Sequence, residues 1–195
     1  MFAYHNPNQI FFSEPNWKSY VRAPYTATPT GLRSWLLDRG SLTQRLMKLS
    51  RGEFKVEVLT QQMASPMLSE IRALGMPLRQ KALIRQVILY GCNIPLVYAR
   101  SVIPVKTLTG RLKNLRKLNN KPLGALLFRD IAMQRGDIEI GCLQNNGYLH
   151  QEFANNYDAA VWGRRSLFYL DKKPLLVSEL FIPGFNKKLL SSSFY

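Results

Sequence analysis

The length, composition and charge of the chain set the first limits on its function. With 195 residues, of which 46% are hydrophobic and 20% charged, the chain has the size and composition of one globular domain with a substantial core. No apolar run reaches the roughly 18–20 residues that a membrane-spanning helix needs, which argues against a helical membrane protein. The first residues, MFAYHNPNQIFFSEPNW, lack the basic region and apolar core of a signal peptide.

The positive charge of the chain favours anionic partners but does not distinguish among them. Lysine and arginine total 27 against 12 for aspartate and glutamate, which gives a formal net charge of +15. Such a field attracts nucleic acid, an anionic membrane surface or a small acidic substrate. A merely solubilising basic surface is an equally acceptable interpretation.

The cysteines and histidines give no sign of a disulfide framework or a metal site. Cys92 and Cys142 are the only cysteines, and His5 and His150 lie far apart in the sequence. Their spacing matches no metal-ligand motif. We therefore expect a cytoplasmic protein from a reducing compartment, without a structural metal.

The first elements predicted along the chain are an irregular arm and two helices. Residues 1–27 are rich in Asn, Pro and aromatic residues, which is typical of irregular structure. A helix is predicted over 29–39, with Gly40 as its stop. Ser41 is suited to cap a second helix over 42–49, whose apolar residues fall near one face.

Strands joined by tight turns dominate the rest of the chain. Segment 71–80 contains Gly75 and Pro77 and is predicted as a turn region, and the polar segment 142–160 as a long loop. Hairpin signals recur and parallel crossover units are scarce, so we predict an α+β fold with a mainly antiparallel sheet. The predicted strands cover residues 54–62, 81–91, 96–105, 135–141, 161–171 and 174–183.

A helix-turn-helix arm is predicted between the third and fourth strands. Leu112, Leu115 and Leu118 recur at helical spacing, NNK turns the chain, and Pro122 fits the first turn of a second helix. The first helix is basic, which would suit nucleic acid or a membrane surface. However, its cations lack aromatic residues that stack on bases, and a protein core can equally bury its three leucines.

Two charged residues lie inside apolar predicted strands. Arg85 stands in IRQVILYG and Glu179 in LLVSELFIP, and alternation places each on a face with apolar neighbours. Desolvating either charge is costly unless something compensates. One interpretation is a buried Arg85–Glu179 salt bridge that needs no ligand. The other is a small-molecule pocket with apolar walls and a few convergent polar groups.

Further residues bear on the choice between a buried salt bridge and a small-molecule pocket. Leu42 and Leu123 each fall in the first turn of a predicted helix, where backbone N–H groups lack helical acceptors and bind carboxylates well. Taken alone, each leucine is simply a core residue. Arg164 and Arg165 face opposite ways on a strand, so at most one of them serves a site.

Eight spaced blocks, in the order given, carry a family resemblance. They are SLTQRL, IRQVILYG, ARSVIPV, TLTG, NKPLGALLF, IEIG, WGRRS and KPLLVSELFIP. Together they resemble the chorismate lyase family, over about Trp17 to Pro183. The resemblance implies cleavage of chorismate to 4-hydroxybenzoate and pyruvate, the first committed step toward ubiquinone, without cofactor or metal. It also implies an antiparallel sheet with helix-turn-helix flaps over a buried pocket.

The resemblance also implies roles for four residues. The family's arginine, which holds the ring carboxylate, falls on Arg85, and its glutamate, which hydrogen-bonds the ring hydroxyl, falls on Glu179. We expect these two to be the catalytic residues. The two backbone donors to the ring carboxylate fall on Leu42 and Leu123.

The remaining expectations concern organisation and partners. We expect a single chorismate lyase-like domain over 1–195, with 1–16 and 184–195 as peripheral arms. We expect a monomer whose partner is chorismate rather than nucleic acid, with at most weak association with anionic membrane surfaces. The alternative is a non-catalytic effector-binding domain of the same fold, which would bind an aromatic carboxylate without reaction.

Overall fold

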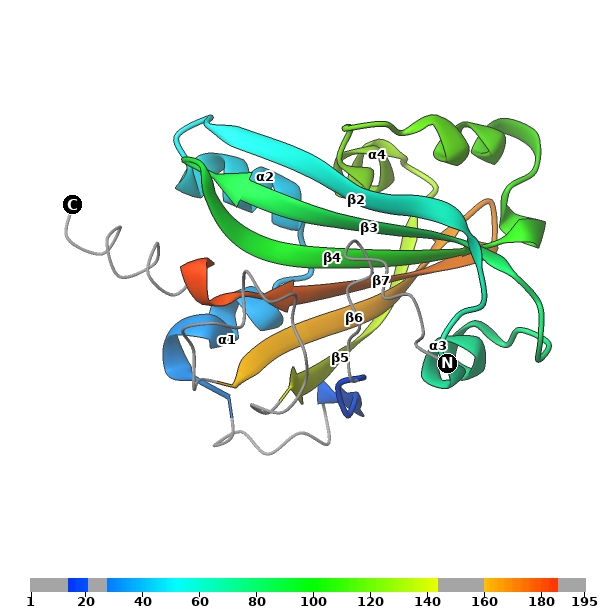
Figure 1. The fold of residues 1–195 in the computed structure, drawn as a ribbon, viewed down its shortest axis with the longest axis horizontal. Coiled ribbons are helices and arrows are strands. Elements are labelled where there is room, and N and C mark those ends of the chain that lie inside the picture. The colour runs from blue at the N-terminus through cyan, green and yellow to red at the C-terminus, as the bar shows by residue number, and fades with distance from the viewer. Residues whose placement is uncertain (1–13, 21–27, 144–159, 186–195) are drawn as a thin grey trace, which may run out of the picture.

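A single antiparallel sheet forms the centre of the protein. The computed structural model describes residues 14–20, 28–143 and 160–185, and Figure 1 shows their arrangement. Seven strands pair in the order β1-β5-β6-β7-β4-β3-β2, and every neighbouring pair is antiparallel. The predicted α+β class is confirmed. The strands are β1 (Lys18–Ser19), β2 (Phe54–Ala64), β3 (Ala82–Gly91), β4 (Ile94–Pro104), β5 (Gln134–Leu143), β6 (Val161–Leu170) and β7 (Lys173–Phe181).

Two hairpins at the centre of the sheet are closed by two-residue turns. Cys92 and Asn93 join β3 to β4, and Asp171 and Lys172 join β6 to β7. All four residues have positive φ angles, of 52°, 60°, 48° and 60°. Turns of this kind match the right-handed twist of the strands they connect. Both hairpins are where the sequence predicted them.

The helices divide between the two faces of the sheet. On one face, α1 and α2 pack with Leu36 and Leu46 fully buried, and η4 and α4 form a second apolar cluster beside them. On the opposite face, α3 packs through Ile71 and Leu74. The helices are α1 (Thr30–Leu36), α2 (Leu42–Leu49), α3 (Leu68–Leu74) and α4 (Leu123–Arg129), with 3₁₀ segments η3 (Val105–Thr107) and η4 (Gly110–Lys117).

One predicted element is wrong and others differ in detail. The start of the predicted turn region 71–80 belongs to α3, whose Glu70 accepts a hydrogen bond from the N–H of Met67 at 2.8 Å. The N-cap residue of this helix is Met67 and not a Ser, Thr, Asp or Asn, so the sequence carries no capping signal for the start of the helix. The first helix ends at Leu36, before the predicted 29–39 boundary. Within the arm 1–27, β1 pairs with β5.

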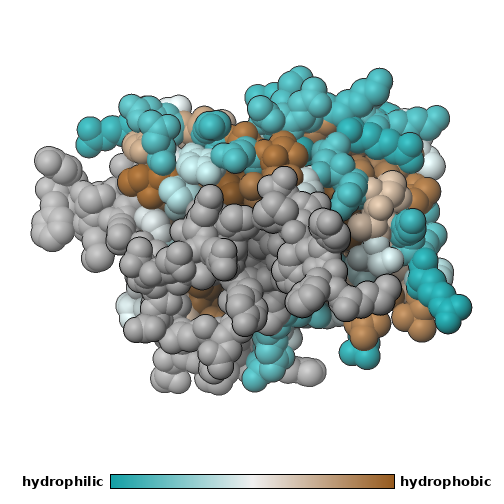
Figure 2. All heavy atoms as spheres, viewed as in Figure 1, coloured by the Kyte–Doolittle hydropathy of each residue, from teal (hydrophilic) through white to brown (hydrophobic). Residues whose placement is uncertain are grey.

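The predicted helix-turn-helix arm is present with a tighter first helix. Leu112, Leu115 and Leu118 are buried and spaced by three residues, which suits the three residues per turn of the 3₁₀ segment η4. Pro122 lies one position before α4, as its N-cap residue. Hydrophilic residues gather along the upper edge of the molecule, over this arm (Figure 2). The arm therefore has a buried apolar side and a polar outer side.

Most of three predicted segments lies outside the described residues. These are the arms 1–16 and 184–195 and the loop 142–160. The single-domain organisation of 1–195 stays a prediction.

Candidate active site

A mostly apolar pocket lies on the face of the sheet that α1, α2, η4 and α4 cover. Its walls come from strands β2 to β7 on the sheet side and from α2 and α4 on the helix side. The four residues predicted for the site all line it. Arg164, one of the two neighbouring arginines considered from the sequence, lines it as well, and Arg165 does not. A further lining arginine, Arg135, was not singled out by the sequence. The polar and predicted lining residues are Leu42, Thr43, Arg85, Ser101, Leu123, Arg135, Arg164 and Glu179.

The N-termini of α2 and α4 meet at the pocket. Leu42 and Leu123 are the first residues of these helices, and no described residue accepts a hydrogen bond from either backbone N–H. A Cβ atom added at Gly124 would lie 2.9 Å from the hydroxyl oxygen of Thr43. Glycine at this position therefore allows the two helix ends to approach. Ser41 fixes the first of them, because its Oγ accepts from the N–H of Gln44 at 3.3 Å.

Arg85 points from β3 into the pocket and is only 2% exposed. It donates to the side-chain oxygen of Gln61 at 2.8 Å and to the carbonyl of Lys121 at 3.1 Å. Both acceptors are neutral, and no described carboxylate pairs with it. Burial lowers the pKa of the Arg85 guanidinium. A buried cation without an anionic partner favours binding of an anion.

Glu179 pairs with a different arginine from the one considered in the sequence analysis. The proposed Arg85–Glu179 salt bridge is wrong, because Arg164 Nε donates to Glu179 Oε2 at 2.6 Å. The two residues stand directly opposite each other on β6 and β7. Alternation along a strand predicts the face of a side chain, whereas the register between strands decides its partner.

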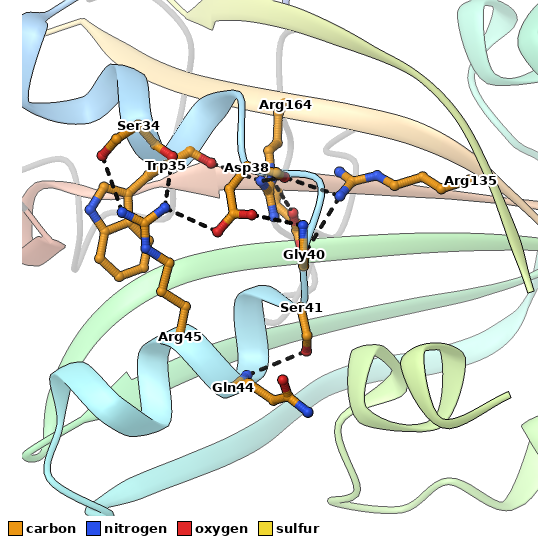
Figure 3. A network of polar contacts seen from close by, with 10 residues as sticks. Ser34, Trp35, Asp38, Gly40, Ser41, Gln44, Arg45, Arg135 and Arg164 are labelled. Carbon is orange, nitrogen blue, oxygen red and sulfur yellow. Dashed lines mark hydrogen bonds and ion pairs between the residues drawn. The ribbon is translucent and has the colours of Figure 1, made fainter. Parts of the chain in front are cut away.

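Arg164 also holds the loop between α1 and α2. It is 1% exposed, and its Nη1 donates to the carbonyls of Trp35 at 2.7 Å and Asp38 at 2.6 Å. Figure 3 shows this guanidinium directed at the loop from the sheet. The loop leads into the N-terminus of α2, so one buried arginine connects Glu179 to the segment that presents Leu42.

Asp38 stiffens the same loop from within (Figure 3). Its carboxylate accepts from the N–H of Gly40 at 2.7 Å and from Arg45 at 3.1 Å. Burial acts to raise the pKa of Asp38, but these two hydrogen bonds together with the positive charges of Arg45 and Arg164 outweigh it, and the pKa lies below its usual value. The guanidinium of Arg45 also lies 3.7 Å from the centre of the Trp35 ring, a cation–π contact.

Arg135 is the pocket residue that sequence reasoning missed most completely. It donates to Ser166 Oγ at 3.2 Å and to the carbonyl of Asp38 at 3.1 Å, and it lies 5.2 Å from the centre of the Phe168 ring. Burial, and then the positive charge of Arg164, lower the pKa of Arg135 to about 10.

Irregularities in two edge regions of the sheet explain why Arg135 and Gln61 reach the pocket. In β5, the register shifts between Arg135 and Ile138. Strict alternation from Ile138 would place Arg135 on the opposite face, but the extra residue turns it toward Phe168, its direct cross-strand partner. In β2, a shift after Val58 similarly sets Gln61 opposite Arg85. A pattern of period two cannot reveal such bulges.

The opposite face of the sheet has its own ion pairs. Arg165 donates to Glu139 at 2.6 Å and to Ser69 at 2.6 Å, so the prediction that Arg164 and Arg165 face opposite ways is confirmed. Arg100 and Glu70 form a buried two-point pair, with distances of 2.7 and 3.0 Å. Within residues 14–20, 28–143 and 160–185, no cluster of His, Cys, Asp and Glu could hold a metal, and no helix has the length and apolarity to span a membrane.

The comparison with protein families decides the assignment of the chain. The family described as chorismate lyase matches residues 17–189. The chain belongs to the chorismate lyase family. Its relatives include proteins named probable chorismate pyruvate-lyase. The one from Psychromonas ingrahamii is 39% identical over 171 residues, covering 80% of this chain and 87% of the relative. The one from Methylococcus capsulatus is 38% identical over 154 residues, covering 78% and 95%.

Solved structures resemble this family member in fold alone. The effector domain of PhnF from Mycobacterium smegmatis has a TM-score of 0.58 at 12% identity, over 75% of this chain and 91% of that domain. A GntR-family transcriptional regulator from Bacillus cereus has a TM-score of 0.51 at 10% identity, over 67% and 92%. The same fold thus occurs in regulators as well as in this family.

Proposed function

We propose that this member of the chorismate lyase family converts chorismate into 4-hydroxybenzoate and pyruvate, the first committed step of ubiquinone biosynthesis. One observation carries the proposal. Arg85 and Glu179, on β3 and β7, line one apolar pocket together with the N-termini of two helices. An arginine without an anionic partner suits the ring carboxylate of chorismate, and Glu179 suits its hydroxyl.

The ring carboxylate is held on the helix side of the pocket. Arg85 supplies the charge, and the N–H groups of Leu42 and Leu123 supply two further donors. The supporting observation is that none of these N–H groups has an acceptor among the described residues. The hydrogen bond from Arg85 to the carbonyl of Lys121 keeps the segment before α4 in place. The carboxylate therefore fixes the position of the ring relative to Glu179.

The reaction is an elimination that needs one proton transfer. The ring carbon that bears the hydroxyl loses its hydrogen as a proton, and the neighbouring ring carbon loses its bond to the enolpyruvyl oxygen. The electrons of the C–H bond complete the aromatic ring, and the leaving oxygen takes up a proton. The resulting enol becomes pyruvate. Within the described residues, Glu179 is the one carboxylate that lines the pocket, so we assign the proton transfer to it.

Arg164 positions Glu179 for this proton transfer. It occupies Oε2 with a 2.6 Å hydrogen bond, and no described residue donates to Oε1. The unoccupied oxygen is available to the substrate hydroxyl and its neighbouring C–H group. The apolar walls, among them Val87, Leu89 and Phe168, exclude water from the ring.

A second candidate function follows from the fold likeness. The PhnF domain is an effector domain, and a pocket of this kind can bind an aromatic carboxylate without reaction. The two functions differ in one outcome. A sensor binds 4-hydroxybenzoate and leaves chorismate intact, whereas a lyase consumes it.

The deciding experiment is incubation of the purified protein with chorismate in the presence of EDTA. Chromatography should reveal 4-hydroxybenzoate and pyruvate in equal amounts, and the Glu179→Gln variant should produce neither at a comparable rate. Intact chorismate beside an active control enzyme, with 4-hydroxybenzoate still bound, would favour the effector-binding function.

The proposal extends to the oligomeric state of the protein, its location and its contact with membranes. The protein is a cytoplasmic monomer, and a chain with two cysteines suits a reducing compartment. Its net charge of +15 attracts the chorismate dianion and allows weak contact with anionic membranes. Light scattering after size-exclusion chromatography tests the monomer. Flotation with anionic liposomes at low salt tests the membrane contact.

A further inference from the structure

We propose that Arg135 binds the carboxylate of the enolpyruvyl side chain of chorismate, and so forms a second anion subsite in the pocket. The inference deepens the proposed function and rests on it. It assigns a role to a residue that neither the strand pattern nor the family resemblance singled out.

The charges in the pocket do not balance. Among the residues that the structure describes, three arginines, Arg85, Arg135 and Arg164, line it with a single carboxylate, Glu179. Arg164 and Glu179 neutralise each other in a 2.6 Å ion pair. Two cations are left, and each donates only to neutral acceptors among the described residues. Arg85, which is buried, and Arg135, which is half-buried, each contact no carboxylate among the described residues. Two such cations match the two carboxylates of chorismate, whereas 4-hydroxybenzoate carries one.

Arg135 lies on the same side of the pocket as Glu179. Nη1 of Arg135 and Nη1 of Arg164 donate to the same carbonyl oxygen, that of Asp38, at 3.1 and 2.6 Å. Arg164 in turn contacts Glu179, so Arg135 belongs to the Glu179 side of the pocket (Figure 3 shows Arg135 and Arg164 converging on the loop). The electrostatic effect of Glu179 on the pKa of Arg135 agrees with this proximity.

The chemistry of chorismate requires an anion partner on that side. The enolpyruvyl ether is attached to the ring carbon next to the one that bears the hydroxyl. If Glu179 binds the hydroxyl and Arg85 the ring carboxylate, the side-chain carboxylate must lie near Glu179 and far from Arg85. Arg135 is the cation on that side of the pocket that forms no ion pair with a described residue. After elimination, the same contact holds the carboxylate of the leaving enolpyruvate.

The local structure of β5 directs the Arg135 side chain into the pocket and restricts its motion. A bulge in β5 turns Arg135 onto the pocket face, and bulges redirect side chains beside functional sites. Its guanidinium lies over the face of Phe168, which restricts its motion. Its hydrogen bonds to the α1–α2 loop give it a structural role as well. The test must therefore separate subsite binding from support of the loop.

The experiment compares ligands that do and do not carry the second carboxylate. The probes are 3-(1-carboxyvinyloxy)benzoate, which has both carboxylates, and 4-hydroxybenzoate, which has only the ring carboxylate. In Arg135→Gln, we expect the affinity for the two-carboxylate probe to fall by about 10- to 100-fold, as for a lost charge-assisted hydrogen bond. The affinity for 4-hydroxybenzoate should change by less than about twofold. Arg129→Gln, which removes an exposed arginine outside the pocket, is the control of equal charge change.

Two outcomes would overturn the subsite. One is a parallel loss of both ligands in Arg135→Gln, which would mean that Arg135 only supports the loop. The other is unchanged affinity for the two-carboxylate probe. If Arg135→Gln does not fold, the wild-type protein provides the test. It must bind the two-carboxylate probe more tightly than it binds the same probe with its side-chain carboxylate esterified. Equal affinities for the probe and the ester would contradict the proposal. Because these are binding measurements, failure to turn over chorismate would be recorded separately, as failure of the proposed function.

Discussion

Arg164 Nε lies 2.6 Å from Glu179 Oε2, across two directly paired strands, and both side chains are largely buried. This pair places one oxygen of Glu179, a pocket-lining residue, in a fixed contact and leaves the other without a donor among the described residues. Because Arg164 also holds two carbonyls of the α1–α2 loop, the pair connects the proposed catalytic carboxylate to the N-terminus of α2.

The first prediction concerns the chemistry of Glu179. Glutamine at this position keeps the shape of the side chain but cannot accept a proton, so kcat should fall by about 10²- to 10⁴-fold, the typical contribution of general acid–base catalysis. Steady-state assays with chorismate measure the change, and thermal unfolding by circular dichroism checks the fold. Near-normal turnover would rule out the proton-transfer role.

The second prediction concerns the stability of the Arg164–Glu179 pair. Arg164→Met leaves Glu179 buried without its partner, which should cost about 3–5 kcal/mol of unfolding free energy. Urea denaturation measures the loss. Adding Glu179→Gln to Arg164→Met should recover part of it, with a coupling of about 1 kcal/mol or more.

If the two losses simply add, the pair contributes no specific interaction. Arg111→Met serves as a comparison, because Arg111 forms ion pairs with Asp130 and Asp171 while its side chain is 53% exposed. Solvent screens such exposed pairs, so this variant should lose much less stability than Arg164→Met.

The third prediction separates Arg85 from Arg135. Arg85 should bind the carboxylate that substrate and product share, so Arg85→Gln should weaken 4-hydroxybenzoate and the two-carboxylate probe alike, by about 10- to 100-fold. Isothermal titration calorimetry measures both affinities. Selective loss of the two-carboxylate probe in Arg85→Gln would reverse the assignment of the two subsites.

The fourth prediction concerns the close packing of β6 on β7. A Cβ atom at Gly163 would lie 2.7 Å from the carbonyl oxygen of Glu179 and 2.3 Å from a methyl group of Leu180. Gly163→Ala should therefore destabilise the protein by about 1–3 kcal/mol, the usual cost of overpacking. Gly31→Ala is a matched control, because no atom lies within 4 Å of its added Cβ and the residue is in helix α1. Equal stability of the two variants, measured by urea unfolding, would contradict the packing argument.

The fifth prediction is a pH dependence from Asp38. Its pKa is lowered in the folded protein, so the unfolded chain binds a proton at a higher pH than the folded one. The resulting stability is present above the unfolded pKa, near 3.8, and is lost as the pH falls through the lower folded pKa. Asp38→Asn should therefore be less stable than the wild type at pH 7, and the difference should shrink at pH 3. A constant difference in urea denaturation at both pH values would show that ionisation of Asp38 is not its source.

The sequence by itself determined the elements that depend on local chemistry. Alternation placed Arg85 and Glu179 on the pocket face, Ser41 marked the start of α2, and the hairpin turn at Cys92–Asn93 lay between its predicted strands. These features follow from side-chain period, capping and turn conformation, which act over a few neighbouring residues.

Only the tertiary structure decided the electrostatics of the pocket. The β6–β7 register made Arg164, and not Arg85, the partner of Glu179. The bulge in β5 brought Arg135 onto the same face, against the alternation of its own strand. Register and bulges arise from pairing between strands that are distant in the chain, so no local pattern carries them.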